Sequence, residues 1–177
     1  MSTTSQKIQT IKEHIKGYPD FPTKNVLFRD IFSVLKQPSI FALLRDIMLE
    51  HTKSLDFDCV IGLDSRGFLF GPIISLEHQK PFIPIRKKGK LPGEVTSVSY
   101  KLEYGEDIFE IQADAIKSGD RILIIDDLLA TGGSLSASCE LVQLAGGIVV
   151  ECLVVMELAE LKGRDKFQSK VHSFIQY

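Results

Sequence analysis

Residues 121–134 read RILIIDDLLATGGS, and this stretch decides the fold of the chain. The aliphatic run at residues 122–125 is typical of a strand buried on both faces, as in a parallel sheet. Two carboxylates, Asp126 and Asp127, close the run. Apolar residues then recur mainly at helical spacing over residues 134–145, and Gly146-Gly147 ends the helix. The stretch therefore predicts a strand, an acidic strand end, a short loop and a helix.

The loop between the predicted strand and helix has the properties of a phosphate site. In open parallel sheets, ligands bind beyond the carboxyl ends of the strands, where the two carboxylates are expected. The first N–H groups of a helix lack internal partners and carry the positive end of its dipole, so a phosphate monoester fits there. Each piece alone also suits a solvated turn and helix cap, but the complete order is much more specific. The expected phosphate-binding residues are Ala130, Thr131, Gly132, Gly133 and Ser134.

Residues 124–134 resemble the motif that binds 5-phosphoribosyl-1-pyrophosphate (PRPP) in the type I phosphoribosyltransferases. The resemblance extends over nearly the whole chain and is strongest to the members of this family that act on adenine. It implies an α/β fold: a mostly parallel sheet flanked by helices, with a small hood from the N-terminal segment. It also implies one domain over residues 1–177, with the hood at about 1–35 and a mobile lid at about 86–105. The sequence has no P-loop signature and no G-x-G-x-x-G after a strand, so neither rival nucleotide-binding fold is supported.

Length, charge and cysteine content narrow the class of protein. The 177 residues suit a single domain, and the net charge of -2 provides no basic field that would attract nucleic acid. No apolar stretch reaches the roughly 20 residues of a membrane span, and the N-terminus lacks the apolar core of a signal peptide. Cys59, Cys139 and Cys152 lie inside apolar segments. We therefore expect a reduced, cytoplasmic protein with these cysteines in its core and with no nucleic-acid or membrane partner.

Strands and helices alternate along the chain, which predicts a mostly parallel α/β sheet. The expected helices span Ser5–Lys16, Pro38 to about Leu55, Phe68–His78, residues 134–145 and a short segment near Leu158–Phe167. The expected strands span Cys59–Leu63, Phe82–Ile85, residues 121–125, Ile148–Met156 and Val171–Ile175. A polar segment at residues 86–99 is expected to precede a hairpin with strands at 100–104 and 108–111.

Two further segments carry groups suited to pyrophosphate. A buried strand ends in Asp64-Ser65-Arg66-Gly67, where the planar fork of the arginine suits pyrophosphate oxygens. A basic run follows at residues 86–90, which stands out in a slightly acidic chain. An exposed turn and a solvated basic loop are the ordinary alternatives for these segments. The resemblance instead assigns pyrophosphate binding to Asp64, Ser65, Arg66, Gly67, Arg86, Lys87 and Lys90.

The resemblance also assigns the nucleobase site and the lid residues. Leu27, Phe28 and Arg29 fall in the hood, where Phe28 would stack on adenine, although by composition this segment reads as a loop anchored in the core. Asn25 stands where glycine is usual, and asparagine tolerates the left-handed conformation that such a turn needs. Glu103 matches the family's candidate proton donor to the base, and Tyr104 matches its lid tyrosine. Closure of the lid would exclude water from PRPP.

The implied reaction transfers the 5-phosphoribosyl group from PRPP to N9 of adenine and gives AMP and pyrophosphate. The candidate catalytic residues are Glu103, Asp126 and Asp127. The two aspartates would hold the ribose hydroxyls directly or through metal-bound water, and Mg²⁺ would arrive mainly on the substrate. The family further implies a homodimer.

Two alternatives stay open at this point. The same reaction on hypoxanthine or guanine is disfavoured by the extended lid and by residues 27–29. A non-catalytic PRPP-sensing regulator of the same fold is disfavoured because Arg66, Glu103 and Tyr104 are all present, with no added DNA-binding segment.

Overall fold

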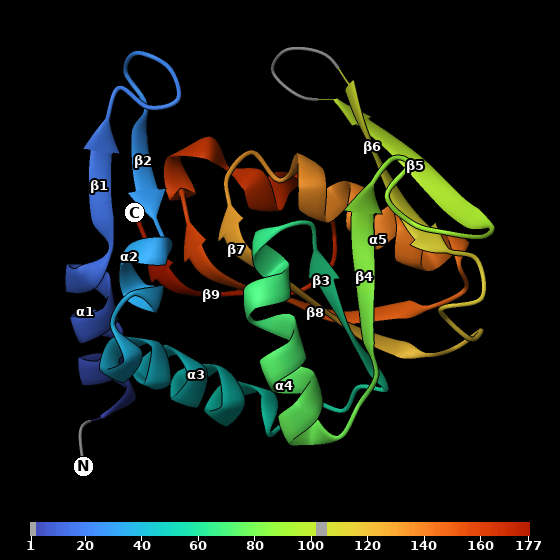
Figure 1. The fold of residues 1–177 in the computed structure, drawn as a ribbon, viewed down its shortest axis with the longest axis horizontal. Helices are drawn as coiled ribbons and strands as arrows, with labels where there is room; N and C mark the ends of the chain where they lie inside the picture. Colours follow the sequence, from blue (N-terminus) through green and yellow to red (C-terminus); the bar gives the residue numbers. More distant parts are fainter. Residues whose placement is uncertain (1–2, 102–105) are drawn as a thin grey trace. The chain divides into compact units, whose positions relative to one another are not determined.

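Strand β7 (Arg121–Leu129) lies at the centre of a sheet, as its apolar sequence requires (Figure 1). The side chains of residues 122–125 are all 0% exposed, so the strand is buried on both faces. Full burial stabilises the folded state by roughly 1.5–3 kcal/mol for each such aliphatic side chain. In this computed structural model, the structure describes residues 3–101 and 106–177. Within these two ranges, no helix has the length and apolarity needed to cross a membrane.

Over the described residues, the sheet has the strand order β5-β6-β4-β3-β7-β8-β9. The five strands from β4 to β9 in this order are parallel, whereas β6 runs antiparallel to β4 and pairs with β5 as a hairpin. The remaining bounds are β3 Cys59–Leu63, β4 Phe82–Lys87, β5 Val95–Lys101, β6 Glu106–Gln112, β8 Ile148–Glu157 and β9 Val171–Gln176. The prediction of a mostly parallel α/β sheet is confirmed.

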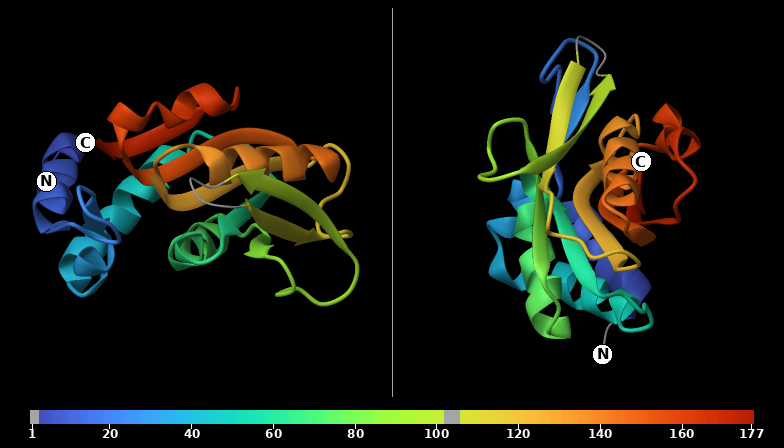
Figure 2. Two further views of the ribbon diagram at one scale, coloured as in Figure 1. Left: turned by 90° about the horizontal axis from the view of Figure 1, so that it is seen from above. Right: turned by 90° about the vertical axis from the view of Figure 1, so that its right-hand side faces the viewer.

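Helices α4 (Gly71–His78) and α5 (Gly133–Leu144) lie on opposite faces of this sheet (Figure 2). Leu135, Leu141 and Val142 of α5 are at most 1% exposed and belong to the core cluster that contains the strand side chains. The cysteines are free and buried, as expected. Three short 3₁₀ helices complete this part of the chain: η1 Arg66–Leu69, η2 Ala159–Leu161 and η3 Gly163–Lys166.

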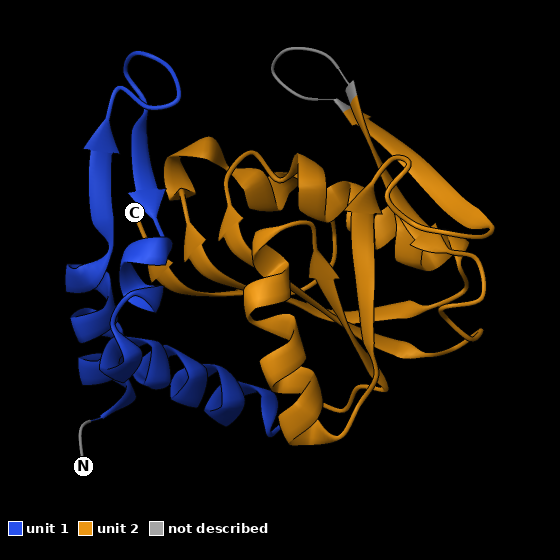
Figure 3. Ribbon diagram, in the orientation of Figure 1, with its two compact units in different colours: residues 1–54 blue, residues 55–177 orange. Residues whose placement is uncertain are grey.

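The chain divides into two compact units, residues 1–54 and 55–177 (Figure 3). The sheet belongs to the larger unit. The smaller unit contains α1 Thr4–His14, β1 Lys16–Pro19, β2 Leu27–Asp30, α2 Phe32–Leu35 and α3 Pro38–Thr52. Strands β1 and β2 form an antiparallel pair, and Asn25 between them has a φ of 69°, so the expected left-handed turn is present. The single-domain description with a hood at residues 1–35 stays a prediction.

Several predicted bounds are wrong. Strand β7 continues to Leu129, so Asp126 and Asp127 lie inside the strand rather than after it. Strand β5 begins at Val95, inside the polar segment that was expected to precede the hairpin. The single short helix expected near residues 158–167 is a pair of 3₁₀ helices, and β1, β2 and α2 were not predicted. The extension of β7 matters most, because it changes what surrounds the two carboxylates.

Candidate functional site

Asp126 and Asp127, the acidic pair, lie on β7 just beyond the last residue that pairs with β3, where β7 still pairs with β8. Strand β3 pairs with β7 as far as Ile125, whereas β8 stays paired with it as far as Leu129. The turn after β3 occupies the side that is left open. A Cβ built on Gly67 would lie 2.4 Å from the carbonyl oxygen of Ile125, so only glycine fits at this position. This close approach brings the turn that contains Arg66 to the carboxylates.

Arg66 and Asp127 form the ion pair of this site. Their Nε and Oδ2 atoms are 2.9 Å apart, and the Asp127 side chain is 3% exposed, compared with 34% for Arg66. The backbone N–H of Asp127 donates to Oδ1 of Asp126 at 2.9 Å. The two carboxylates therefore have different partners, in agreement with the expectation that they need not share one role.

Burial opposes the negative charge on both carboxylates. It raises the pKa of Asp126 well above its ordinary value, and the neighbouring Asp127 charge raises that pKa further. Burial also raises the pKa of Asp127, while the Arg66 guanidinium acts in the opposite direction. A ligand with hydroxyl donors, or with a bound cation, would favour the charged form of this pair. The pair therefore suits a ligand that brings hydroxyl donors or a hydrated cation.

A cavity of about 160 Å³ adjoins the acidic pair and is lined by Arg66 and residues 126–135 without interruption. All five predicted phosphate-binding residues line it: Ala130, Thr131, Gly132, Gly133 and Ser134. Helix α5 begins at Gly133, so its first N–H groups lie at this cavity. One water occupies about 30 Å³ of liquid, so the cavity has room for a phosphate group. The structure thus brings together the acidic pair, Arg66 and residues 130–134, which are called the phosphate loop below.

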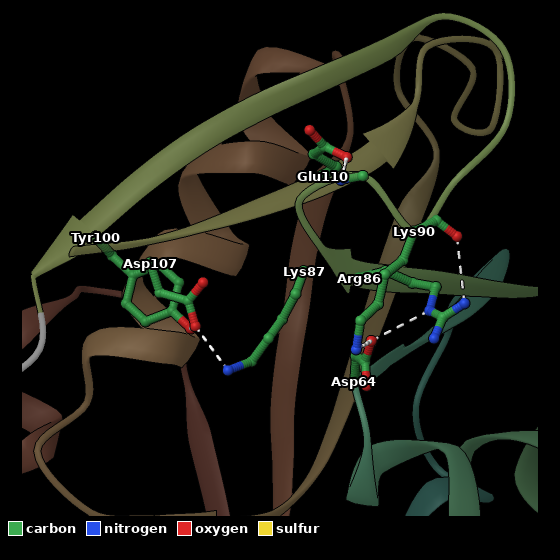
Figure 4. Close-up of polar contacts among 8 residues, drawn as sticks. Asp64, Arg86, Lys87, Lys90, Tyr100, Asp107 and Glu110 are labelled. Carbon is green, nitrogen blue, oxygen red and sulfur yellow. Dashed lines mark hydrogen bonds and ion pairs between the residues drawn. The ribbon is translucent and has the colours of Figure 1, made fainter.

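Three of the predicted pyrophosphate-binding cations, Arg86, Lys87 and Lys90, pair with two separate carboxylates (Figure 4). Oδ2 of Asp64 lies 3.1 Å from Nε of Arg86 and 3.3 Å from Nζ of Lys90. Lys87 lies instead against Asp107, with Nζ 2.7 Å from Oδ2, and this contact holds the pKa of Asp107 below its ordinary value. Asp64 therefore contacts two of the predicted pyrophosphate-binding cations. Ser65 and Gly67 belong to the adjoining turn, where the Asp64–Ser65 peptide bond is cis.

Three polar residues of the hairpin were missed by the sequence analysis. Tyr100 and Asp107 are cross-strand partners, and the Tyr100 hydroxyl donates to Oδ2 of Asp107 at 3.3 Å. Burial raises the pKa of Tyr100 to about 12. Glu110 is 5% exposed and accepts the N–H of Gly89 at 2.8 Å. A correct register for the hairpin would have paired Tyr100 with Asp107 from sequence alone.

The predicted adenine residues lie on β2 in the smaller unit. Phe28 lines a cavity of about 500 Å³ together with Tyr18, Pro19, Asp20, Phe21 and Asp30. The rings of Phe21 and Phe28 meet edge to face, with centroids 5.1 Å apart. Leu27 and Arg29 do not line this cavity, because alternate strand residues point to opposite faces. Glu103 and Tyr104 lie outside the described residues.

The fold is that of a phosphoribosyltransferase, and comparison with known proteins supports this class. A family model described as "Phosphoribosyl transferase domain" matches residues 31–176. An adenine phosphoribosyltransferase of Drosophila pseudoobscura pseudoobscura is 50% identical, over 99% of this chain and 98% of the relative. The human adenine phosphoribosyltransferase is 45% identical, over 97% of both chains.

A solved structure agrees with these relatives. The adenine phosphoribosyltransferase of Saccharomyces cerevisiae, complexed with adenine and an imino-altritol bisphosphate, is 41% identical with a TM-score of 0.91, over 96% of this chain and 99% of that one. The chain belongs to the phosphoribosyltransferase family and, within it, to the adenine phosphoribosyltransferases. The resemblance found in the sequence is thereby confirmed.

Proposed function

We propose that this protein transfers the 5-phosphoribosyl group of PRPP to N9 of adenine, giving AMP and pyrophosphate in purine salvage. The observation that carries the proposal is the single cavity lined by Arg66, both carboxylates and the phosphate loop. It offers anion-binding and hydroxyl-binding groups side by side, which a phosphorylated ribose requires. The names of the relatives and the adenine bound to the yeast enzyme support the choice of base.

The phosphate loop and the acidic pair would hold the two ends of the sugar. Residues 130–134 would bind the 5′-phosphate through backbone N–H groups and the hydroxyls of Thr131 and Ser134. Asp126 and Asp127 would accept hydrogen bonds from the ribose hydroxyls. Their charge would favour the positive charge that develops on the ring as pyrophosphate departs ahead of attack by the base. The protein thus acts mainly by positioning and by electrostatics.

The cationic cluster would receive the leaving group. Arg66, Arg86, Lys87 and Lys90 are the candidate pyrophosphate contacts, with Asp64, Ser65 and Gly67 shaping the turn that carries Arg66. Bound Mg²⁺ would neutralise charge on the phosphate oxygens, and Asp126 and Asp127 would meet it through water. Within the described residues, no group of three or more carboxylate, thiol or imidazole side chains could hold a metal ion.

The remaining assignments rest on the family resemblance and belong to the same proposal. Leu27, Phe28 and Arg29 would bind adenine, with Phe28 as the stacking ring. Glu103 would exchange the proton of the base, and Tyr104 would close the lid formed by residues 86–105. We also propose a cytoplasmic homodimer, and the three buried free thiols support a reducing compartment.

A base-competition assay tests the proposed function. Equal concentrations of adenine, hypoxanthine and guanine are supplied with PRPP and Mg²⁺, and the nucleotide products are separated and measured. AMP is expected to be the main product. Formation of IMP or GMP without AMP would overturn the assignment to adenine. No product with any base, from a folded protein that binds PRPP, would favour a PRPP sensor instead.

A further inference from the structure

The backbone at Gly163 lies directly against the phosphate loop. A Cβ built on Gly163 would lie 2.3 Å from the carbonyl oxygen of Ala130 and 3.0 Å from the backbone nitrogen of Gly132. A Cβ built on Gly132 would lie 2.2 Å from the carbonyl oxygen of Gly163. Neither glycine can carry a side chain without a backbone shift. The position of Gly163 therefore limits the backbone conformations that residues 130–132 can adopt.

The residue after this glycine is held by an ion pair with two close contacts. Arg164 Nε lies 2.6 Å from Oε1 of Glu157, and one of its terminal nitrogens lies 2.6 Å from Oε2. The other terminal nitrogen donates to the carbonyl oxygen of Val171 at 2.8 Å. Paired contacts of this kind fix the plane of the guanidinium as well as its distance. The Glu157 side chain is 5% exposed and the Arg164 side chain is 41% exposed, so the carboxylate is buried and solvent screens the pair from the arginine side.

Glu157 is itself tied to the strand that leads into the phosphate loop. It is the pairing partner of Leu129, the residue before Ala130, and the N–H of Leu158 donates to the Leu129 carbonyl at 2.9 Å. These contacts form a ring. Leu129 leads along the chain into residues 130–132, which contact Gly163, and the next residue, Arg164, pairs with Glu157, which in turn pairs with Leu129. In such a ring, displacement of any member changes the loop geometry.

We propose that Glu157 and Arg164 are positioning residues that hold Gly163 against residues 130–132 and thereby set the geometry of the 5′-phosphate site. The proposal rests on the proposed function in one respect, the assignment of residues 130–134 to the 5′-phosphate. Backbone N–H groups bind a phosphate well only when their directions are fixed in advance. The ion pair is expected to affect the 5′-phosphate of the ligand much more than free pyrophosphate, because three of the four candidate pyrophosphate cations, Arg86, Lys87 and Lys90, contact Asp64 and Asp107 and do not line this cavity.

A comparable ion pair at the opposite end of β7 provides a matched control. Arg121 contacts Asp58 with Nε–Oδ2 and N–Oδ1 distances of 3.0 and 2.9 Å. It has no contact with the phosphate loop among the described residues. Loss of Arg121 therefore removes an arginine–carboxylate pair from the end of β7 far from Leu129, whereas Glu157 lies on β8 beside Leu129 and Arg164 lies in η3.

The test measures binding of ribose 5-phosphate, and separately of pyrophosphate with Mg²⁺, by titration calorimetry. We expect Arg164→Ala to weaken ribose 5-phosphate about 10- to 100-fold, as for other residues that orient ligand-binding groups, and to leave pyrophosphate within about twofold. Arg164→Lys should give an intermediate loss, and Arg121→Ala should bind both ligands like the wild type. Thermal unfolding of each variant is recorded in parallel.

Unchanged binding of ribose 5-phosphate by Arg164→Ala would overturn the proposal, and so would equal losses for both ligands. If Arg164→Ala does not fold, Arg164→Lys carries the test: a selective loss supports the proposal and wild-type binding overturns it. Failure of the proposed function is separable, because a wild-type protein that binds both ligands but forms no AMP would contradict the reaction and leave this test intact.

Discussion

At the scale of single residues, the acidic pair shows a conflict between stability and function. Asp126 and Asp127 are adjacent, Asp126 is half-buried, and the Asp127 side chain is 3% exposed and pairs with Arg66. The pKa of each is raised because burial disfavours the charged form. Groups perturbed in this way are frequent at functional sites. Under the proposed function, the ribose hydroxyls and the substrate-borne Mg²⁺ would meet the charge of this pair.

Replacing Asp126 by asparagine should therefore stabilise the protein. The side chain would keep an oxygen for the Asp127 N–H and would lose the buried charge. We expect the free energy of unfolding at pH 7 to rise by about 0.5–2 kcal/mol, the usual gain when a strained functional site is relieved. Denaturant unfolding with a fluorescent or circular-dichroism readout measures this difference.

The pH dependence of this gain has a definite sign. A raised pKa means that the folded state binds its proton more tightly than the unfolded chain, so wild-type stability falls as pH rises above the ordinary aspartate value of 3.8. The free-energy gain of Asp126→Asn over the wild type should therefore grow as pH rises from 3.8 to the raised pKa of Asp126 in the folded state. Above that pKa the gain should be constant. Asp127→Asn should gain less, because it also removes the partner of Arg66. An advantage that shrinks with rising pH would contradict this account.

At the scale of elements, the hairpin β5–β6 organises the basic run. Glu110 lies on β6 and accepts the N–H of Gly89, whose φ is 75°. Asp64 forms ion pairs with Arg86 and Lys90, and Asp107 forms an ion pair with Lys87. The carboxylates thus restrict a loop that its sequence alone would leave solvated. The Glu110 hydrogen bond is partly buried and its carboxylate is charged, so it should contribute more than the ion pairs, whose Arg86, Lys87 and Lys90 side chains are 34–49% exposed.

Glu110→Ala should weaken PRPP binding. A hydrogen bond to a charged group contributes about 1.5–3 kcal/mol, so we expect KM for PRPP to rise roughly tenfold or more. Glu110→Gln keeps an oxygen for Gly89 and should stay within about threefold of the wild type. The exposed Asp114→Asn, near the end of the same hairpin, provides the control. Equal KM values for the alanine variant and the wild type would show that the Gly89 contact is not needed.

The sequence predicted the buried strands at the centre of the sheet well, but it predicted the bounds of the hairpin β5–β6 less well. Residues 122–125 and 59–63 are continuous apolar runs, and local pattern suffices for strands buried on both faces. Strand β5 was predicted to start too late, because an edge strand with one solvated face can be rich in serine and threonine, as residues 95–101 are. Strand β7 was ended at its first charge, although the pairing with β8 continues to Leu129.

The same distinction explains the candidate site. The phosphate loop is a local motif, so its residues were predicted from sequence and line one cavity. The roles of Asp107, Glu110 and Glu157 depend on partners from other elements, and no local pattern reveals them. Asp64 was assigned to pyrophosphate, but its contacts are with Arg86 and Lys90, which became visible only in three dimensions.

At the scale of the whole molecule, burial of the cysteines tests the core. Cys59, Cys139 and Cys152 are 3%, 4% and 0% exposed, and burial raises the pKa of Cys59 to about 11. We expect an aromatic disulfide reagent to modify all three thiols of the native protein at least about 100-fold more slowly than those of the protein unfolded in guanidinium chloride. Rapid modification of one thiol under native conditions would contradict the burial described for that residue.

The central claim is that the acidic pair and the phosphate loop serve one PRPP-dependent reaction. The most direct measurement is the rate of AMP formation from adenine and PRPP with Mg²⁺, for the wild type and for the double variant Asp126→Asn, Asp127→Asn. The wild type should form AMP, and the folded double variant should be slower by roughly 10³-fold, since it lacks the charge that favours the developing cation. A double variant that forms AMP within a few-fold of the wild-type rate would contradict the account.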